Sequence, residues 1–523
     1  MRPSDLMRTL ALLLLAALTA PAAAQTLGAV EFPNSGAAAA QAPFLRGLLL
    51  LHSFEYDDAA GAFREAQAAD PGFALAYWGE AMTYTHPLWN QQDWATARAV
   101  LGRLGGSSAA RLARAGTERE RLYLETTEAL YFADAPKPKR DTLCAEAFGR
   151  LLRANPSDDD AKAFYALWLM GLSQGVRNIP TYMRAGALAE EVYRHNPRHP
   201  GALHYIIHAF DDPIHAPLGL FAAREYSLIA ADADHAQHMT THIFLALGMW
   251  NETVRQNAIA SGRDTSAWRP GHYTSWLDYG LLQQGRYQLA RRILEVTRGT
   301  AGSSQVAGRQ SYLLSMRAHY LIDTGSWSDP VADWVLNRTL AGPIPRAMDV
   351  YALAVAQLER GGARRADSLL AELDRLARAT TDDNSYGGNP RVPSILATQL
   401  RGRLAWARGR KDSALALLRD ASGLEDDLPL EFGPPDIVKP THELYAEMLL
   451  AANQPAEAQR EFGRALELAP GRSAALLGLA RAARAAGDST VAGRALDQLK
   501  QNWSEADGDV PGLEEVRRLE TNR

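Results

Sequence analysis

Small and large apolar residues recur along the chain at fixed offsets, and each set ends in a proline. Ala59, Phe63, Ala66 and Pro71 stand at relative positions 0, +4, +7 and +12, with Gly47 before them. On a helix, small residues let a second helix approach closely, and a phenylalanine fills the space between the two. Proline lacks the backbone donor and ends the helix. The pattern therefore predicts a pair of packed helices.

The same pattern returns further along the chain. Its full offsets are found again at Cys144, Phe148, Leu151 and Pro156, and at Ala458, Phe462, Ala465 and Pro470. Less regular matches are Ala185, Ala189, Val192 and Pro197, and the pairs Gly285 and Ala290, Gly361 and Ala366, and Gly409 and Ala414. In these offsets, most of the chain resembles the tetratricopeptide repeat family. The resemblance implies an all-α fold, a right-handed α-solenoid of roughly eight to eleven stacked antiparallel helix pairs.

The first 24 residues have the three parts of a secretory signal peptide. Arg2 and Arg8 flank the start, Leu10 to Leu18 form a short apolar core, and small residues precede Gln25. The apolar run is much shorter than the roughly 20 residues that a membrane-spanning helix needs. We therefore expect an exported, soluble protein, periplasmic or extracellular, without membrane insertion.

Charge and cysteine content narrow the possible functions. The chain has 55 basic and 60 acidic residues, and removing Arg2, Arg8 and Asp5 leaves 53 and 59, a net charge of −6. This near balance gives no basic surface for nucleic acid. Cys144 is the only cysteine, so no disulfide is possible within one chain. Because it occupies a small, buried position of the repeat, we expect it to be structural.

The pattern also divides the chain into segments. We expect a signal peptide at 1–24, a flexible segment at 25–42, a solenoid at 43–420 with a histidine-rich groove at 199–320, a loop at 421–440, C-terminal repeat units at 441–510 and a tail at 511–523. The loop is acidic and then proline-rich. A loop of this length in a compact array is usually functional or disordered, and we expect it to fold over the groove.

Two pairs of histidines stand out among the candidate functional residues. His204 and His208 are four residues apart, as are His238 and His242, so each pair lies on one face of a helix. The second pair follows the first by 34 residues, which is the period of the tetratricopeptide repeat. The two pairs are therefore expected to occupy equivalent positions on consecutive repeats.

The family resemblance implies that the first helix of each pair lines a concave groove. The loop glycines and prolines then place both histidine pairs at the fifth and ninth helix positions, which face the groove. By the same reasoning, groove positions are taken by His272, His319, Glu443 and Glu447, and nearer the N-terminus by His52 and His86. The remaining histidines are expected to be loop, cap or surface residues; these are His195, His199, His215, His235 and His442. His235 begins the second helix, so it could also support a metal ligand.

Four imidazoles on two adjacent helices can converge on one metal ion. Helix axes pack about 8–10 Å apart and a metal–nitrogen bond is about 2.0–2.1 Å long, so rings pointing inward can meet. Histidine ligands suit copper, zinc, iron or nickel. Asp211 and Glu443 are then candidate catalytic residues, and Tyr205, Trp276 and Tyr279 form the aromatic wall of a binding pocket.

Two functions are compatible with these residues. One is a binding module whose concave groove holds a protein segment or small ligand, with the histidines, Glu443 and Glu447 as polar anchors. The other is a metal-dependent hydrolase or oxidoreductase with His204, His208, His238 and His242 as ligands. HxxxH alone is a common chance pattern, and groove histidines can also be purely structural.

Overall fold

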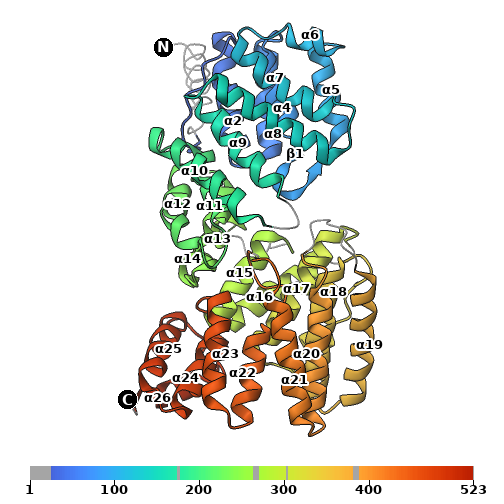
Figure 1. Cartoon of the computed structure of the whole chain (residues 1–523), viewed down its shortest axis with the longest axis vertical. Coiled ribbons are helices and arrows are strands. Elements are labelled where there is room, and N and C mark those ends of the chain that lie inside the picture. Colours follow the sequence, from blue (N-terminus) through green and yellow to red (C-terminus); the bar gives the residue numbers. More distant parts are fainter. Residues whose placement is uncertain are drawn as a thin grey trace, which may run out of the picture.

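The computed structural model describes residues 25–173, 177–262, 270–301, 304–380, 388–430 and 432–521, so the expected signal peptide lies outside the described residues. Within these ranges the chain is almost entirely helical. Helices that follow one another along the chain pack in pairs, and the pairs stack on each other (Figure 1). The predicted all-α solenoid of stacked antiparallel helix pairs is therefore confirmed.

The first half of the chain forms an N-terminal lobe and a middle column (Figure 1). The N-terminal lobe contains α2 (Ala38–His52), α3 (Tyr56–Ala69), α4 (Ala74–Met82), α5 (Trp94–Leu104), α6 (Ser108–Leu112), α7 (Glu118–Tyr131), α8 (Lys137–Ala154) and α9 (Asp159–Gly171). Between α4 and α5 lie β1 (Thr85–His86), the 3-10 turn η1 (Pro87–Trp89) and β2 (Gln91–Gln92). The middle column contains α10 (Ile179–His195), α11 (Pro200–Ala209), α12 (Ala216–Ile229), α13 (Asp234–Ala246) and α14 (Trp250–Ala260).

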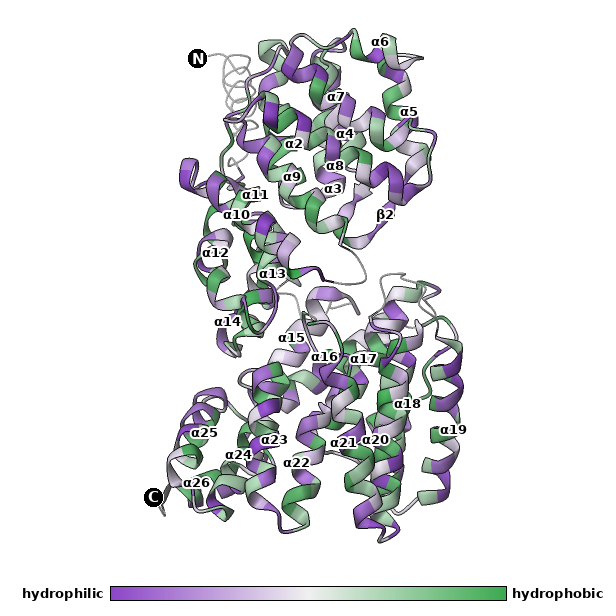
Figure 2. Cartoon of the chain, in the orientation of Figure 1, coloured by the Kyte–Doolittle hydropathy of each residue, from purple (hydrophilic) through white to green (hydrophobic). Residues whose placement is uncertain are grey.

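The second half forms the C-terminal lobe, in yellow to red in Figure 1. Its helices are α15 (His272–Gln283), α16 (Tyr287–Ala301), α17 (Ala307–Thr324), α18 (Pro343–Glu359), α19 (Ala363–Ala379), α20 (Val392–Ala407), α21 (Lys411–Asp426), α22 (Thr441–Ala451), α23 (Pro455–Leu468), α24 (Ser473–Ala485), α25 (Ser489–Asn502) and α26 (Leu513–Thr521). A second 3-10 turn, η2 (Pro330–Asp333), follows α17. Figure 2 shows hydrophilic and hydrophobic residues alternating along outer helices such as α19, as expected of helices with one buried face.

The residues of the sequence pattern make the contacts between paired helices. Phe63 of α3 is fully buried, and its ring lies against Gly47 of α2 and Gly79 of α4. A Cβ atom at Gly47 would come within 2.9 Å of that ring, so the close approach requires glycine. Phe462 lies against Gly478 in the same way. Cys144 is also buried, and burial raises the pKa of its thiol well above the ordinary value, as expected of a structural cysteine.

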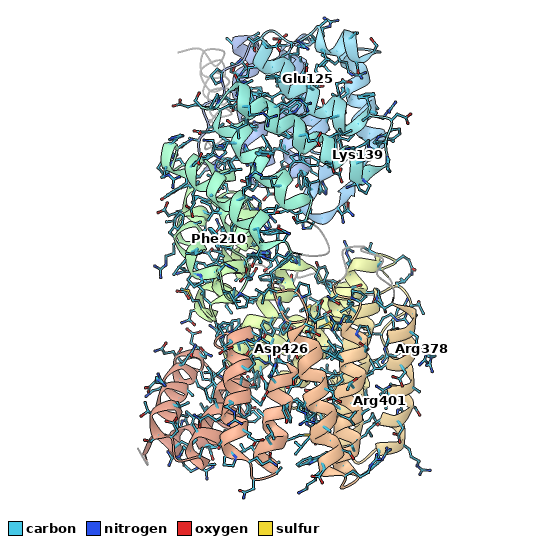
Figure 3. The ribbon with its side chains drawn as sticks, in the orientation of Figure 1. Glu125, Lys139, Phe210, Arg378, Arg401 and Asp426 are labelled. Atoms are coloured by element: carbon cyan, nitrogen blue, oxygen red, sulfur yellow. The ribbon has the colours of Figure 1, made fainter. Side chains whose placement is uncertain are left out.

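Each end of the solenoid folds back on the middle of the chain. Near the N-terminus, the Ala29 amide donates to the Arg198 carbonyl at 2.9 Å. Near the C-terminus, the Trp250 indole donates to the Gly471 carbonyl at 2.8 Å, which joins α14 to the start of α24. Figure 3 shows Phe210, which follows α11, in the middle column.

Two non-helical segments also contact the repeats. Residues 25–37, part of the segment expected to be flexible, form no helix or strand, but Leu27 and Phe32 are buried against the first repeats. The segment between α21 and α22 begins after Asp426, and its Phe432 reaches His242 of the middle column. Within the described ranges, every helix is too short or too polar to span a lipid bilayer.

Candidate metal centre

Three helices bring six histidines together. α11 begins at Pro200. Proline suits the first turn of a helix, because the backbone N–H that it lacks would have no partner within the helix. The His199 side chain caps α11 by accepting from the Ala202 amide. α13 is buried along nearly its whole length, so its histidines lie in the interior. The Glu55 carboxylate accepts from the His235 amide at 2.8 Å and ties the start of α13 to the loop before α3.

The first group consists of His204 and His208 of α11 and His235 of α13. One ring nitrogen from each lies within 4.8 Å of the other two. The Nε2 atoms of His204 and His208 are 3.1 Å apart. His204 Nδ1 donates to the backbone carbonyl of His52 at 2.7 Å, and His235 Nε2 is buried without a hydrogen-bond partner among the described residues. Because the His204 Nδ1 proton is donated to the His52 carbonyl, His204 Nε2 is unprotonated and faces His208 Nε2.

The second group consists of His238 and His242 of α13 and His272 of α15. Again one ring nitrogen from each lies within 4.8 Å of the other two. The Nε2 atoms of His238 and His242 are 3.0 Å apart. His238 Nδ1 contacts Asn257 Oδ1 at 2.7 Å, and His242 Nδ1 contacts an oxygen of Asp211. The Asn257 orientation is fixed, because its amide nitrogen donates to the Thr253 carbonyl at 3.1 Å.

These contacts determine where the protons of the second pair lie. Both Nδ1 atoms face oxygen acceptors, so both carry the single proton of a neutral imidazole. Both Nε2 atoms then point lone pairs at each other across 3.0 Å. Such a pair is repulsive unless a proton or a metal cation lies between the nitrogens. The first pair is less restricted, because His208 Nε2 can carry a proton and donate it to His204.

Burial favours the neutral form of five of these imidazoles. It lowers the pKa of His204 and of His272 to about 3. For His208, His235 and His238, burial lowers the pKa well below the ordinary histidine value, and the neighbouring histidines lower the pKa further. A neutral imidazole is the form that binds a metal, whereas an added proton is disfavoured at these positions.

The distances also suit a metal. Two nitrogens bound at about 2.0–2.1 Å to one ion lie about 2.9 Å apart at a right angle and about 3.3 Å apart at the tetrahedral angle. The observed separations of 3.0 and 3.1 Å fall within that range. The Nδ1 partners Asp211, Asn257 and the His52 carbonyl are the outer contacts that orient metal-ligating histidines. Each group can hold one transition-metal ion.

The two groups lie side by side. The ring centroids of His208 and His242 are 5.9 Å apart, and those of His235 and His238 are 6.1 Å apart. A cavity of about 50 Å³ touches members of both groups. Its lining residues are Leu88, Trp89, Arg177, Tyr182, His208, Asp211, His235, Met239, His242, His272 and Phe432.

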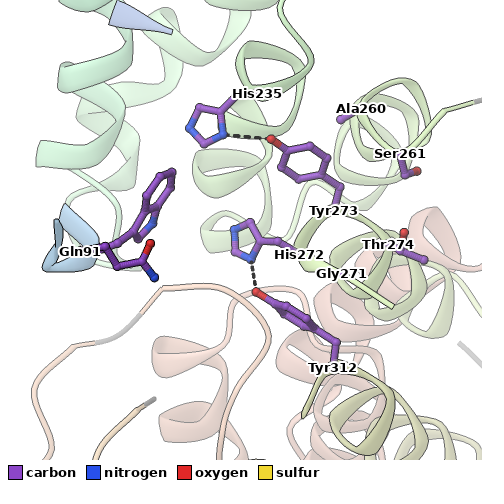
Figure 4. Close-up of a pocket in the computed structure, with 10 residues that line it drawn as sticks. Gln91, His235, Ala260, Ser261, Gly271, His272, Tyr273, Thr274 and Tyr312 are labelled. Atoms are coloured by element: carbon purple, nitrogen blue, oxygen red, sulfur yellow. Dashed lines mark hydrogen bonds between the residues drawn. The ribbon is translucent and has the colours of Figure 1, made fainter. Parts of the chain in front are cut away.

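A larger pocket of about 510 Å³ adjoins this cavity (Figure 4). Its lining residues are Trp89, Gln91, His235, Ala260, Ser261, Gly271, His272, Tyr273, Thr274 and Tyr312. The Tyr273 hydroxyl lies 3.1 Å from His235 Nδ1, and the Tyr312 hydroxyl lies 3.3 Å from His272 Nδ1. One histidine from each group therefore faces the pocket with a tyrosine beside it.

A third cluster, formed by His52, Asp160 and His199, has a different proton arrangement. His199 Nδ1 accepts from the Ala202 amide, so its proton is on Nε2, which faces Asp160 Oδ1 at 3.5 Å. His52 Nε2 contacts the same oxygen at 3.0 Å, and its Nδ1 contacts the Tyr205 hydroxyl. His199 thus leaves no lone pair for a metal. The cluster is a buried hydrogen-bond network that holds the end of α2, whose His52 carbonyl orients His204.

The predicted aromatic residues are spread over two regions. Trp276 lies in the centre, with its ring 4.3 Å from that of His242. The Tyr205 hydroxyl is hydrogen-bonded to His52 in the third cluster. Tyr279 belongs to the C-terminal lobe, where it contacts His319 at 5.0 Å between ring centroids and accepts from Arg472.

The predicted acidic residues are also separated. Asp211 is part of the centre, because one of its oxygens holds His242. Glu443 is fully buried between Lys439 and Arg472, with contacts of 2.6 and 2.7 Å. Glu447 contacts the same lysine at 2.5 Å. No contact among the described residues joins either glutamate to the six histidines.

Several residues of the centre lack a specific sequence signal. His235 has one, because it precedes His238 by three residues and so shares its helix face. Asn257, Trp89, Tyr273 and Phe432 have none, since their repeat offsets do not distinguish them from other residues.

The chain matches no protein-family model and no curated protein sequence. It is similar to three solved helical-repeat structures at low identity. The human IFIT1 dimer with m7Gppp-AAAA is 13% identical over 91% of this chain and 92% of its own, with a TM-score of 0.35. Yeast Tom70 is 12% identical over 92% and 95%, with a TM-score of 0.29. The P58(IPK) TPR domain is 12% identical over 86% and 99%, with a TM-score of 0.23.

Proposed function

We propose that this protein binds transition-metal ions through two adjoining groups of three buried histidines. The observation that carries the proposal is the Nε2 pair of His238 and His242, which face each other at 3.0 Å while both Nδ1 atoms are held by oxygen acceptors. A metal cation between them removes the lone-pair repulsion that the hydrogen-bond pattern creates.

The ligand set favours a catalytic or ligand-exchanging role over a purely structural one. Structural zinc sites are closed by four protein ligands, whereas catalytic sites keep a position open beside three. Each group here supplies three imidazoles, and both border a cavity. We therefore favour a metal-dependent enzyme that activates water or another small oxygen ligand. Imidazole ligands suit copper, zinc, iron and nickel.

The adjoining pocket favours a small ligand over a protein segment. Its volume of about 510 Å³ is typical of small-molecule sites, which range from about 300 to 1,000 Å³. A protein segment bound along the solenoid remains the second candidate, because a helical-repeat scaffold provides the surface for it. That second function would be favoured if a pull-down captured a protein partner only with the folded solenoid and still captured it after the six histidines were substituted.

Metal analysis of untagged, full-length protein tests the proposal. We expect about two transition-metal ions per chain by inductively coupled plasma mass spectrometry, one for each histidine group. His238→Ala should remove at least one, while His195→Ala should change nothing, since the His195 side chain is 61% exposed and bonds Asp159, away from the two groups. A protein that purifies without metal, and whose melting temperature is unchanged by added zinc or copper, would sink the proposal.

We also propose that the protein is exported, on the basis of the apolar run and small-residue site that precede Gln25. N-terminal sequencing of protein from the producing cell should begin at Gln25. Protein that retains its first residues and stays in the cytoplasm would contradict export.

A further inference from the structure

We infer that the large pocket binds an uncharged phenol, with the ring among the aromatic side chains and the hydroxyl in the small cavity between the histidine groups. The inference rests on the proposed metal function, because the hydroxyl oxygen would face the ions held there.

Aromatic side chains form much of the pocket wall. Trp89, Tyr273 and Tyr312 line it together with the imidazoles of His235 and His272. Trp89 and Tyr273 also contact the His235 ring, at 5.9 and 6.3 Å between centroids. Rings at such positions favour an aromatic ligand, because stacked and edge-to-face ring pairs add a favourable interaction to the burial of the ring. An aliphatic ligand of similar size lacks that contribution.

The described lining of the pocket has no formal charge at neutral pH. Its polar groups are Gln91, Ser261, Thr274, the tyrosine hydroxyls and neutral imidazoles. A carboxylate or ammonium ligand would lose its hydration there without a counter-charge. Arg177 lines only the small cavity, where it is paired with Asp212 at 3.1 Å and donates to the Ala209 and Asp211 carbonyls. The described lining of the large pocket therefore favours an uncharged ring, and a carboxylate that entered the small cavity would meet the Asp211 carboxylate.

The small cavity is suited to a single hydroxyl group. Trp89, His235 and His272 border both spaces, so a ligand in the large pocket can extend into the small one. A space of about 50 Å³ is too small for a ring and large enough for a water-sized group. The Asp211 carboxylate borders it, and its Oδ1 is buried without a hydrogen-bond partner in the described structure. A ligand hydroxyl that donates to Oδ1 supplies the missing bond.

Calorimetry on full-length protein loaded with zinc tests the inference, because zinc does not oxidise phenols. We expect 4-methylphenol to bind with one site per chain. Binding should be about tenfold or more weaker for 4-methylanisole, which has no hydroxyl hydrogen, since Asp211 Oδ1 is then left unsatisfied. Binding should also be weaker for 4-methylbenzoate, whose carboxylate has no hydrogen to donate to Asp211 Oδ1 and has the same charge as Asp211, and for metal-free protein.

Two tryptophan variants complete the test. Trp89→Ala removes a pocket wall and should weaken 4-methylphenol binding about tenfold, with the zinc content of the variant measured alongside. Trp94→Ala is the matched control, because Trp94 is 41% exposed and lies outside both cavities. If zinc binds with the expected stoichiometry but 4-methylphenol does not, or if 4-methylbenzoate binds equally well, the inference is overturned while the metal function stands. If zinc itself does not bind, the proposed function fails first.

Discussion

Asn257 lies directly behind the second histidine group, where its side-chain carbonyl accepts the Nδ1 proton of His238. It is fully buried and bonded to one metal-ligand candidate only. Replacing it with leucine keeps the approximate size but removes the acceptor that fixes the imidazole tautomer. We expect Asn257→Leu to weaken metal binding about 10- to 100-fold, as loss of such outer contacts usually does. Competition with a chromophoric chelator measures the change.

Asn257→Asp is the conservative control. It keeps an oxygen acceptor for His238 Nδ1 but loses the bond to the Thr253 carbonyl, so metal affinity should fall less than with leucine. If leucine and aspartate weaken binding equally, Asn257 acts through packing and not through His238.

Glu443 is a single residue that stabilises the C-terminal lobe. It is fully buried, and its carboxylate contacts Lys439 and Arg472. Removing one partner of a buried ion pair leaves an uncompensated charge and costs about 3–5 kcal/mol. We expect Glu443→Gln to lower the free energy of unfolding by about that amount, measured by urea denaturation. Glu447→Gln is the control, because the Glu447 side chain is 42% exposed, and it should have little effect.

The Glu443 carboxylate should also make the stability of the folded protein sensitive to acid. Burial alone raises the pKa of Glu443, but Arg472 and Lys439 outweigh burial and hold the pKa at about 2. Because the folded-state pKa is lower than the unfolded value of about 4.3, the stabilisation is complete above that value and is lost as pH falls towards 2. Unfolding of the unmodified protein between pH 5 and about 3 should therefore show a steeper pH dependence than that of Glu443→Gln. Equal slopes would show that other carboxylates control acid unfolding.

At the scale of single helices, the packing of α2 on α3 depends on Gly47. A Cβ atom there would lie 2.9 Å from the buried Phe63 ring, so the Gly47→Ala substitution overpacks the contact. We expect it to destabilise the protein by about 1–3 kcal/mol. Gly61 of α3 has nothing within 4 Å of an added Cβ, so Gly61→Ala should stabilise the helix by about 0.5–1 kcal/mol. Thermal unfolding of the two variants should shift in opposite directions.

The sequence predicts these helices well because each repeat contact depends on residues close in the chain. Phe63 meets Gly47 and Gly79, its neighbours within one repeat unit and the next. The two HxxxH pairs are predictable for the same reason, since one helix fixes each pair and one repeat separates them. Their division into two groups of three was not predicted, because it depends on how α15 packs on α13.

The remaining residues of the centre come from distant parts of the chain. Trp89 belongs to a turn inserted between α4 and α5, and Phe432 belongs to the segment before α22. Both contact histidines of α13, Trp89 through His235 and Phe432 through His242, across long separations in the chain. Repeat offsets give Glu443 a groove position, but they do not indicate that Lys439 and Arg472 lie on either side of its carboxylate.

At the scale of the whole molecule, the candidate centre joins the middle column to the C-terminal lobe. α11 and α13 belong to the column, and α15 is the first helix of the lobe. His272 of α15 contacts His238 at 4.4 Å between ring centroids, so a metal bound by the second group would link the two parts directly. Metal loss should therefore loosen this junction more than the distant repeats.

Hydrogen–deuterium exchange with and without a strong chelator measures that effect. An ion present at 100 times its dissociation constant stabilises the folded state by about 2.7 kcal/mol, and the gain is concentrated where the ligands are. We expect faster exchange after metal removal in α11, α13 and α15, and unchanged exchange in α8 and α19. His238→Ala should show the same regional increase without chelator and no further response to it. A uniform increase over all helices would mean that the metal stabilises the solenoid as a whole, and no change would mean that the junction is held by protein contacts such as that between Trp250 and Gly471.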